Sequence, residues 1–132
     1  MTVAQSHQAL TNAQHEARGF HLLLTLSGCA SDKLNDAKYL RELTENAALA
    51  TGATIMQIGV EVFQPQGVTA FAVLAESHAS LHTYPESKTV FWDCFTCGDT
   101  CKPEQSVAVL IEALKPAKTD KQLLQRGCPV AD

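Results

Sequence analysis

The chain has 132 residues, of which 45% are hydrophobic and 18% charged, a composition typical of one globular domain and incompatible with a disordered or fibrous protein. Ten Lys and Arg residues against fourteen Asp and Glu residues give a net charge of −4 with no basic block, so nucleic acid is a poor candidate partner. A chain of this length buries roughly two thirds of its unfolded surface, which leaves little room for a deep active site and favours one shared between subunits.

No segment reaches the roughly 20 apolar residues that span a bilayer, because the longest uncharged stretch, 62–75, is interrupted by Pro65 and Gly67. Residues 1–18 lack the apolar core of a secretory signal and are predicted to form a loosely ordered polar leader. We therefore predict a cytoplasmic protein without a membrane partner. The cysteines are odd in number and unevenly spaced, which argues against a disulfide framework; they are Cys29, Cys94, Cys97, Cys101 and Cys128.

The fold is predicted to begin near Gly19, where the apolar run 20–26 indicates a buried strand. From residue 35 onward, apolar residues recur at helical spacing. With Asn35 as N-cap and Gly52 as the left-handed stop, this pattern predicts an amphipathic helix of about four turns.

Two strand candidates, 54–63 and 68–75, flank a turn that contains Pro and Gly, and they predict an antiparallel hairpin. Residues 89–95 indicate another strand, and Pro103 opens a second helix that ends at Pro116. The tail 117–132 is polar and weakly patterned. Residues 19–132 are thus predicted to form one domain with the element order β-α-β-β-β-β-α.

The predicted fold is of the α/β (α+β) class: a two-layer sandwich in which two helices cover one face of a mainly antiparallel sheet. The strands carry apolar residues on both faces, so the uncovered face needs a partner. The tail could cover it, but Leu123 and Leu124 are its few large apolar residues. We therefore favour a homodimer.

Residue types that catalyse reactions concentrate in two segments, 75–86 and 93–101. One hypothesis is a zinc site made of His82 and three cysteines, although the second ligand pair of a strong zinc signature is missing. Another is a redox pair formed by Cys94 and Cys97, although their odd spacing in a strand puts the thiols on opposite faces. The three cysteines of the zinc hypothesis are Cys94, Cys97 and Cys101.

A third hypothesis is nucleophilic chemistry by Ser77. Ser77 lacks the flanking glycines of a hydrolase nucleophile elbow, but its hydroxyl can attack the preceding carbonyl, exchange the amide for an ester and then eliminate. This reaction leaves a pyruvoyl group, whose ketone forms Schiff bases with amines and accepts electrons in decarboxylation. Because Ser77 and His82 are separated by an odd number of positions, their cooperation requires a bend near Ser77.

These residues carry a resemblance. The segments GFHLLLTLSGCASDKLND, NAALATGATI, FQPQGVT, AESHASLHTYPE and DCFTCGD occur in this order. Together they resemble the bacterial and archaeal S-adenosylmethionine decarboxylase proenzyme family, from Gly19 to about Leu114. The ordered combination of E-S-H, L-H-T-aromatic-P-E and F-T-C-G is highly specific, whereas each piece alone is weak.

The resemblance implies that the chain cleaves itself between Glu76 and Ser77, and that Ser77 becomes the pyruvoyl group. It further implies that His82 transfers a proton during processing. Cys97 matches the cysteine that reprotonates the substrate carbon after carbon dioxide leaves, a role that suits a thiol.

The same resemblance implies a substrate site. Phe63 matches an aromatic residue that stacks on the adenine, Glu86 a carboxylate that binds the ribose hydroxyls, and Tyr84 a variable aromatic residue. Thr69 stands where the family usually has a serine that helps processing; it keeps the hydroxyl, so processing should survive. Phe20 and Ala79 also depart from the usual residues, arginine and leucine, and they put substrate choice in doubt.

We therefore expect a pyruvoyl-dependent decarboxylase that acts on S-adenosylmethionine and supplies the aminopropyl donor for polyamine synthesis. The expected enzyme is a homodimer of processed protomers with active sites near the interface, and it needs neither pyridoxal phosphate nor a metal. One alternative is pyruvoyl-dependent decarboxylation of ornithine or arginine, with Glu86 or Glu61 holding the distal cation. A second alternative is a regulatory paralogue without activity, which the intact Ser77, His82 and Cys97 disfavour.

Overall fold

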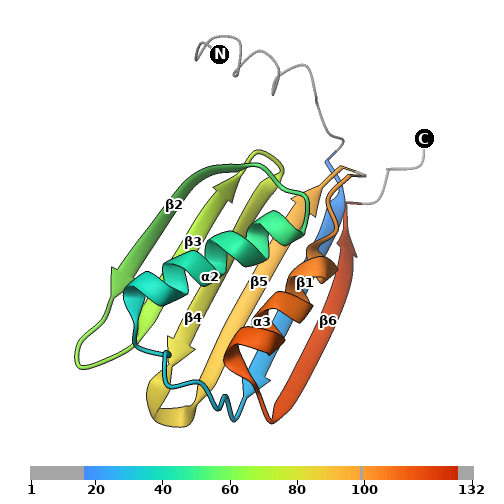
Figure 1. Ribbon diagram of the computed structural model, residues 1–132. Helices are drawn as coiled ribbons and strands as arrows, with labels where there is room; N and C mark the ends of the chain where they lie inside the picture. Colours follow the sequence, from blue (N-terminus) through green and yellow to red (C-terminus); the bar gives the residue numbers. More distant parts are fainter. Residues whose placement is uncertain (1–16, 99, 128–132) are drawn as a thin grey trace.

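The computed structural model describes residues 17–98 and 100–127, and these form one antiparallel sheet with two helices packed on one face (Figure 1). The strand order is β2-β3-β4-β5-β1-β6, so the first strand lies between the last two along the chain. The predicted α+β sandwich is confirmed. Residues 1–16 of the predicted leader lie outside the described residues, and so does Cys128. The strands are β1 (Gly19–Ser27), β2 (Ile55–Val62), β3 (Val68–Leu74), β4 (Ser77–Tyr84), β5 (Thr89–Cys97) and β6 (Lys118–Arg126); the helices are α2 (Ala37–Ala50) and α3 (Ser106–Leu114).

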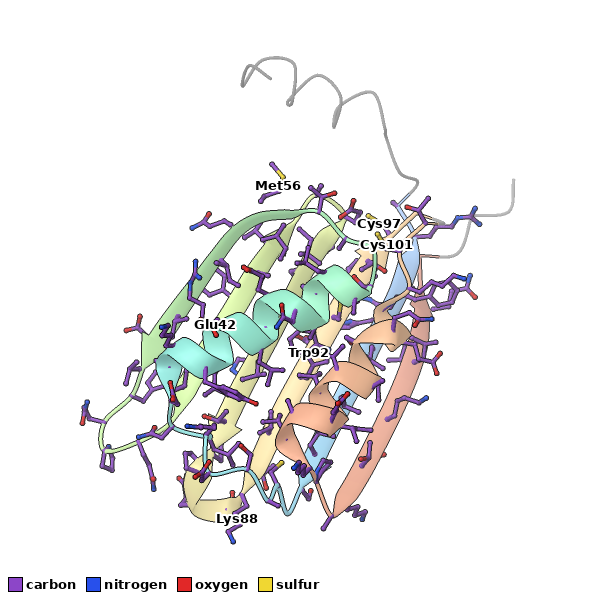
Figure 2. The ribbon with its side chains drawn as sticks, in the orientation of Figure 1. Glu42, Met56, Lys88, Trp92, Cys97 and Cys101 are labelled. Carbon is purple, nitrogen blue, oxygen red and sulfur yellow. The ribbon has the colours of Figure 1, made fainter. Side chains whose placement is uncertain are left out.

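The core lies between the sheet and the helices, because alternate residues of the strands point to that side. In β1, three leucines at alternate positions are buried, and in β5 Trp92 is 1% exposed beneath the helices (Figure 2). The helices contribute leucines at helical spacing and contact each other as well as the sheet. The leucines of this core include Leu22, Leu24, Leu26, Leu40, Leu43, Leu110 and Leu114.

The N-cap of helix α2 lies one residue later than predicted. Asp36 is the N-cap, and its Oδ1 accepts a hydrogen bond of 3.0 Å from the backbone N–H of Tyr39. The Oδ1 of Asn35 instead accepts from the backbone N–H of Gly67 at 2.8 Å, which ties the start of the helix to the β2–β3 turn. Gly52 follows the helix with a φ of +88°, so the predicted left-handed stop is confirmed.

The tail was not expected to contain regular structure, and this expectation is wrong. Strand β6 pairs antiparallel with β1 over the whole length of both strands. All nine of its residues are exposed, so no burial imposes an alternating apolar pattern on its sequence, and backbone pairing alone defines it. Because β6 extends the edge of the sheet, it does not cover the face opposite the helices.

The other elements with a predicted range match it closely, and β4 is the strand of the predicted order for which no range was given. The Pro- and Gly-containing turn joins β2 to β3, and Pro103 opens a short 3-10 helix (Pro103–Gln105) that leads into α3. Helix α3 ends at Lys115 in the left-handed conformation, just before Pro116. Among residues 17–98 and 100–127, no helix is both long and apolar enough to cross a membrane.

The sheet face turned away from the helices is called here the open face. Strand pairing places the odd-numbered residues of β1, β3 and β5 on it, together with the even-numbered residues of β4 and β6. It mixes polar side chains with half-exposed apolar ones. Its exposed large apolar residues are Leu23, Phe71, Val73, Tyr84, Phe91 and Leu124.

Candidate active site

A two-residue turn, Ala75 and Glu76, joins β3 to β4 and holds the predicted scissile bond. Ser77, the first residue of β4, has a φ of +148°, where a residue with a side chain is strained by about 1–3 kcal/mol. Thr54 clamps the turn from the side: its carbonyl accepts from the N–H of Ala75 at 2.9 Å, and its own N–H donates to the Glu76 carboxylate at 3.0 Å. The bend that the sequence required near Ser77 is therefore present.

Cys97 binds the carbonyl oxygen of Glu76, which belongs to the predicted scissile bond. Its backbone N–H and its thiol both donate to the carbonyl oxygen of Glu76, each at a distance of 2.9 Å. Two donors on one carbonyl polarise it and stabilise negative charge that develops on its oxygen. The hydroxyl of Ser77 contacts the imidazole of His78, with 3.3 Å between Oγ and Nδ1. We call Glu76, Ser77, His78 and Cys97 the cleavage group.

Five other predicted site residues line a single cavity of about 290 Å³ on the open face, where β3, β4 and the hairpin turn meet. Within it, the Thr69 hydroxyl lies 3.0 Å from Nδ1 of His82. This volume is at the lower end for small-molecule sites, and the cavity is open on one side, so a ligand there needs a further cover. The five residues, which we call the cavity group, are Phe63, Thr69, His82, Tyr84 and Glu86.

The two groups lie apart on the same chain. Strand β4 pairs with β5 without interruption from Ser77 to Tyr84, so the five-residue step from Ser77 to His82 is fully extended. At about 3.3 Å per residue, this separates the two residues by about 16 Å. The bend at Glu76 therefore does not bring Ser77 and His82 of one chain together, and the expected cooperation between them needs another source.

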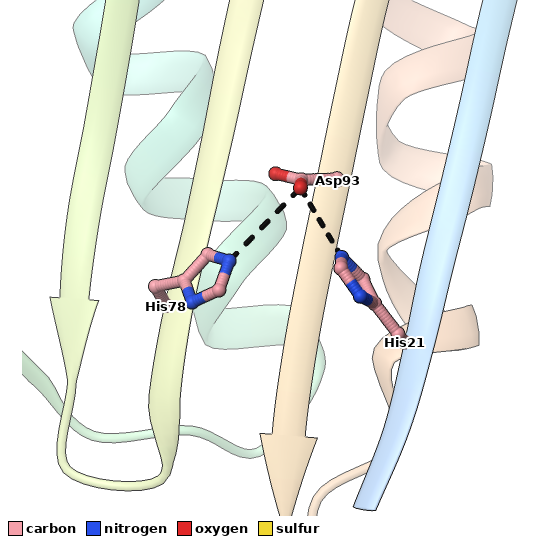
Figure 3. A group of neighbouring side chains, drawn as sticks. All are labelled: His21, His78 and Asp93. Atoms are coloured by element: carbon pink, nitrogen blue, oxygen red, sulfur yellow. Dashed lines mark hydrogen bonds and ion pairs between the residues drawn. The ribbon is translucent and has the colours of Figure 1, made fainter. Parts of the chain in front are cut away.

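The centre of the open face carries a polar cluster that sequence reasoning did not assign. His21 of β1, His78 of β4 and Asp93 of β5 converge there, and one ligand atom from each lies within 4.8 Å of the others (Figure 3). Nε2 of His21 is 3.1 Å from the Asp93 carboxylate, and Nε2 of His78 is 4.0 Å from it. Arg126 donates to Nδ1 of His21 at 3.1 Å, and this fixed positive charge opposes a divalent cation beside it.

The cysteines separate as strand alternation requires. Cys94 is buried among core residues on the helix side, whereas the half-buried Cys97 is on the open face, so the predicted opposition of the two thiols is confirmed. Burial, and then the negative charge of Asp93, raise the pKa of Cys94 to about 12. Burial also raises the pKa of Cys29 and of Cys101.

The zinc hypothesis is wrong for the described part of the chain, because no group of three ligands there contains a cysteine. His82 sits in the cavity group, and Cys94 and Cys97 point to opposite sides of the sheet. Cys101 is buried ahead of the 3-10 turn that leads into α3 (Figure 2).

Four residues that the sequence did not single out join the predicted ones directly or through one another; they are His21, His78, Ser80 and Asp93. His78 contacts Ser77 and Ser80 contacts His82. Asp93 contacts Ser80, and His21 contacts Asp93. Their signal is the alternation of β1, β4 and β5, which puts all four on the open face once the register of these strands is known.

Fold and site together define a small α+β protein with a strained serine after a tight turn, a preceding carbonyl that accepts two hydrogen bonds, and a separate cavity lined by aromatic and acidic side chains. The family model for S-adenosylmethionine decarboxylase matches residues 20–127. The S-adenosylmethionine decarboxylase proenzyme of Brevibacillus brevis is 40% identical over 114 residues, 86% of each chain. That of Methanococcus maripaludis is 43% identical over 109 residues, 83% of this chain and 89% of the relative.

The comparison with solved structures agrees. The crystal structure of the adenosylmethionine decarboxylase from Aquifex aeolicus is similar with a TM-score of 0.79 and 35% identity, covering 89% of this chain and 97% of that one. The chain belongs to the S-adenosylmethionine decarboxylase family, in its prokaryotic proenzyme form. The resemblance of the sequence motifs is thereby confirmed.

Proposed function

We propose that the chain cleaves itself between Glu76 and Ser77 and that the new amino end of the second fragment is a pyruvoyl group that decarboxylates S-adenosylmethionine. Family membership makes the protein a pyruvoyl-dependent carboxy-lyase of polyamine biosynthesis. The roles of single residues, the source of the pyruvoyl group and the assembly of the site are the content of the proposal. The observation that carries it is the strained Ser77 beside a carbonyl held by two donors from Cys97.

The first step is an exchange of amide for ester. Oγ of Ser77 attacks the carbonyl carbon of Glu76, the C–N bond breaks, and an ester joins Glu76 to the Ser77 side chain. His78 contacts Oγ and is placed to take its proton and to pass it to the amine nitrogen that leaves. The two hydrogen bonds from Cys97 stabilise the negative oxygen of the tetrahedral intermediate, and the strain at Ser77 is relieved when the peptide bond breaks.

The second step is elimination. A base removes the α-proton of Ser77, the C–O bond of the ester breaks, and the Glu76 carboxylate leaves as the end of the first fragment. Water then replaces the α-nitrogen, which leaves as ammonia, and the pyruvoyl ketone remains. His82, hydrogen-bonded to Thr69, is the base proposed for the α-proton.

A second copy of the chain supplies His82 to Ser77. His78 and Cys97 of the cleavage group lie on the open face, as the cavity group does, and Ser77 and His82 of one chain are about 16 Å apart along β4. If two copies pack through their open faces with strands reversed, each cavity group meets the cleavage group of the other chain. The exposed apolar residues of the open face support this contact, and packing would close the cavity.

The cavity group suits a nucleoside with a positive charge. Phe63 and Tyr84 offer aromatic faces to an adenine ring and to a sulfonium, and Glu86 offers two acceptors to ribose hydroxyls. When formed, the pyruvoyl ketone supplies the electron sink for loss of carbon dioxide. The Cys97 thiol, already beside the scissile carbonyl, is placed to return a proton to the substrate carbon.

Mixed expression tests both self-cleavage and the shared site. Ser77→Ala and His82→Ala chains expressed alone should each stay whole by intact-mass spectrometry. Expressed together, they form a dimer in which one site has both Ser77 and His82, so the His82→Ala chain should be cleaved. As a control, His82→Ala expressed with the double variant Ser77→Ala/His82→Ala should stay whole.

The outcomes separate the parts of the proposal. Cleavage of Ser77→Ala alone would refute the self-cleavage mechanism. If the mixed variants stay whole while the unaltered chain is cleaved, the site is not completed by a second copy, although self-cleavage stands.

The choice of substrate has its own test. The processed protein should release carbon dioxide from S-adenosylmethionine far faster than from ornithine or arginine, because Phe63 and Glu86 sit in one cavity that fits a nucleoside. The reverse order would favour the smaller amino acids. We expect a pyruvoyl group and neither a metal nor pyridoxal phosphate. Dialysis against a chelator should therefore leave the rate of carbon dioxide release unchanged.

A further inference from the structure

A continuous chain of hydrogen bonds crosses the open face from the cavity group to the polar cluster. It begins at Thr69, whose hydroxyl lies 3.0 Å from Nδ1 of His82. Nε2 of His82 lies 3.2 Å from Oγ of Ser80, and that hydroxyl lies 2.5 Å from Oδ1 of Asp93. None of these contacts between Ser80 and its neighbours was expected from the sequence.

The direction of these hydrogen bonds follows from which groups can donate and which can only accept. A carboxylate only accepts, so Ser80 must donate its single hydroxyl hydrogen to Asp93. Oγ of Ser80 can then only accept from His82, which requires a proton on Nε2 of that imidazole. Nδ1 of neutral His82 is left with a lone pair, and the Thr69 hydroxyl donates to it.

The hydrogen bonds at the His21 end also run toward Asp93. Arg126 has donors only, so Nδ1 of His21 must accept from it, and Nε2 of His21 must carry the proton that it donates to Asp93. Arg126 is itself held over the ring of Phe95, 4.9 Å from the ring centroid. The carboxylate of Asp93 thus receives one hydrogen bond on each oxygen and is kept as an acceptor.

We infer that Ser80 and Asp93 are positioning residues that hold His82 in the tautomer with its proton on Nε2 and its basic nitrogen, Nδ1, facing Thr69. The inference rests on the proposed function, in which His82 is the base of the elimination step. When Nδ1 takes a proton, the imidazole becomes positive, and the negative Asp93 lies one hydroxyl away to stabilise it. Ser80 and Asp93 reach the reacting atoms only through His82.

The isosteric change Asp93→Asn tests the direction of the hydrogen bonds that join His82, Ser80 and Asp93. An amide nitrogen facing Ser80 donates where the carboxylate accepted, so Ser80 would donate to Nε2 of His82 and the proton would move to Nδ1. The same loss of the correct tautomer is known to slow a serine protease about 10⁴-fold when its triad Asp becomes Asn. We expect cleavage at Glu76-Ser77 to slow by at least about 100-fold, a smaller loss because Ser80 stands between the two groups.

The tautomer of His82 can be measured directly, and it would not change if Ser80 and Asp93 only stabilised the fold. In histidine ¹⁵N-labelled protein carrying Ser77→Ala, which keeps the chain whole, the NMR signals of His82 should show the proton on Nε2. With Asp93→Asn added, they should show it on Nδ1. His82→Ala in the same background identifies the signals.

Matched variants complete the experiment, with cleavage followed by intact-mass spectrometry in chains that keep Ser77. Ser80→Ala should slow cleavage and Ser80→Thr should restore it, because threonine keeps the hydroxyl. Asp32→Asn, the same change at an exposed site, should cleave at the parent rate. Thermal unfolding of each variant shows whether slow cleavage comes with loss of the fold.

Two results would overturn the inference. One is a proton on Nδ1 of His82 in the Ser77→Ala parent. The other is cleavage of Asp93→Asn at the normal rate while cleavage of His82→Ala stalls. If His82→Ala itself cleaves normally, it is the proposed function of His82 that fails. The two failures are therefore distinguishable.

Discussion

The two faces of one sheet differ although the same strands build both. In β5, Val90, Trp92 and Cys94 are buried against the helices, whereas Phe91 and Asp93 alternate with them on the open face. The helix side is almost entirely apolar, with buried polar side chains such as Ser106 mostly hydrogen-bonded. The open face instead gathers three histidines, a carboxylate and half-exposed aromatic rings.

The helix side accounts for most of the stability of this fold, and the open face holds the groups that can react. The helix side has the close packing that stabilises a chain of this size. The open face keeps apolar area exposed and titratable groups within hydrogen-bond distance, a combination that favours association with a second copy around a reaction site. Variants on the open face should therefore change assembly and cleavage, and variants on the helix side should change folding stability.

The largest expected effect is the loss of assembly on adding a charge to the open face. Phe91 is 41% exposed there and lines a hollow together with His82 and Asp93. Phe91→Glu should give a monomer in analytical ultracentrifugation and, because the proposed site needs residues of both chains, should abolish cleavage. Leu49→Glu is the control: Leu49 is 52% exposed but lies on α2, on the other side of the molecule.

This result would decide between the two faces. A Phe91→Glu protein that sediments like the parent and is still cleaved would show that the open face is not the interface. Loss of assembly in Leu49→Glu would move the interface to the helix side.

The second prediction concerns the helix side. Trp92 is 1% exposed, and its Nε1 donates to Oγ of Ser106 at 3.0 Å. In a Ser77→Ala background that keeps the chain whole, Trp92→Ala should lower the free energy of unfolding by about 3–5 kcal/mol, because it leaves a large cavity. Trp92→Phe should retain most of this stability, with a loss of about 1–2 kcal/mol. Guanidinium unfolding measures both; equal stability of Trp92→Ala and its parent would contradict the contrast.

Much of this fold could be predicted because local patterns coincide with tertiary structure. The runs 20–26 and 89–95 and both helices carry apolar residues at the spacing that their buried sides require. Strand β6 has no buried side, so nothing in its sequence marked it. Asn35 and Asp36 are both good caps, and only the contact of Asn35 with the β2–β3 turn decides between them.

The site was predictable in its residues and unpredictable in its geometry. The motifs identified Thr69, His82 and Glu86, which the structure brings into one cavity. Their distance from Ser77 depends on β4 remaining extended, which sequence spacing could not establish. The link from His82 through Ser80 to Asp93 depends on the register of neighbouring strands, a long-range property.

The last prediction concerns the share of an alkaline loss of stability that Cys94 contributes. Burial first, and the charge of Asp93 second, raise its pKa to about 12 from the usual 9.0. Below pH 9 the thiol is protonated in both the folded and the unfolded chain, so its contribution is fully present there. Between pH 9 and about 12 the unfolded chain releases the proton and the folded chain keeps it, so the free energy of unfolding falls by about 1.4 kcal/mol per pH unit.

Guanidinium unfolding of Ser77→Ala protein at pH 8, 9, 10 and 11 measures this slope, and Cys94→Ala in the same background isolates it. The alanine variant should be less stable at pH 8, because a buried side chain is shortened, yet should lose less stability above pH 9 than its parent. If Cys94→Ala and its parent lose stability in parallel above pH 9, burial of Cys94 does not set the slope.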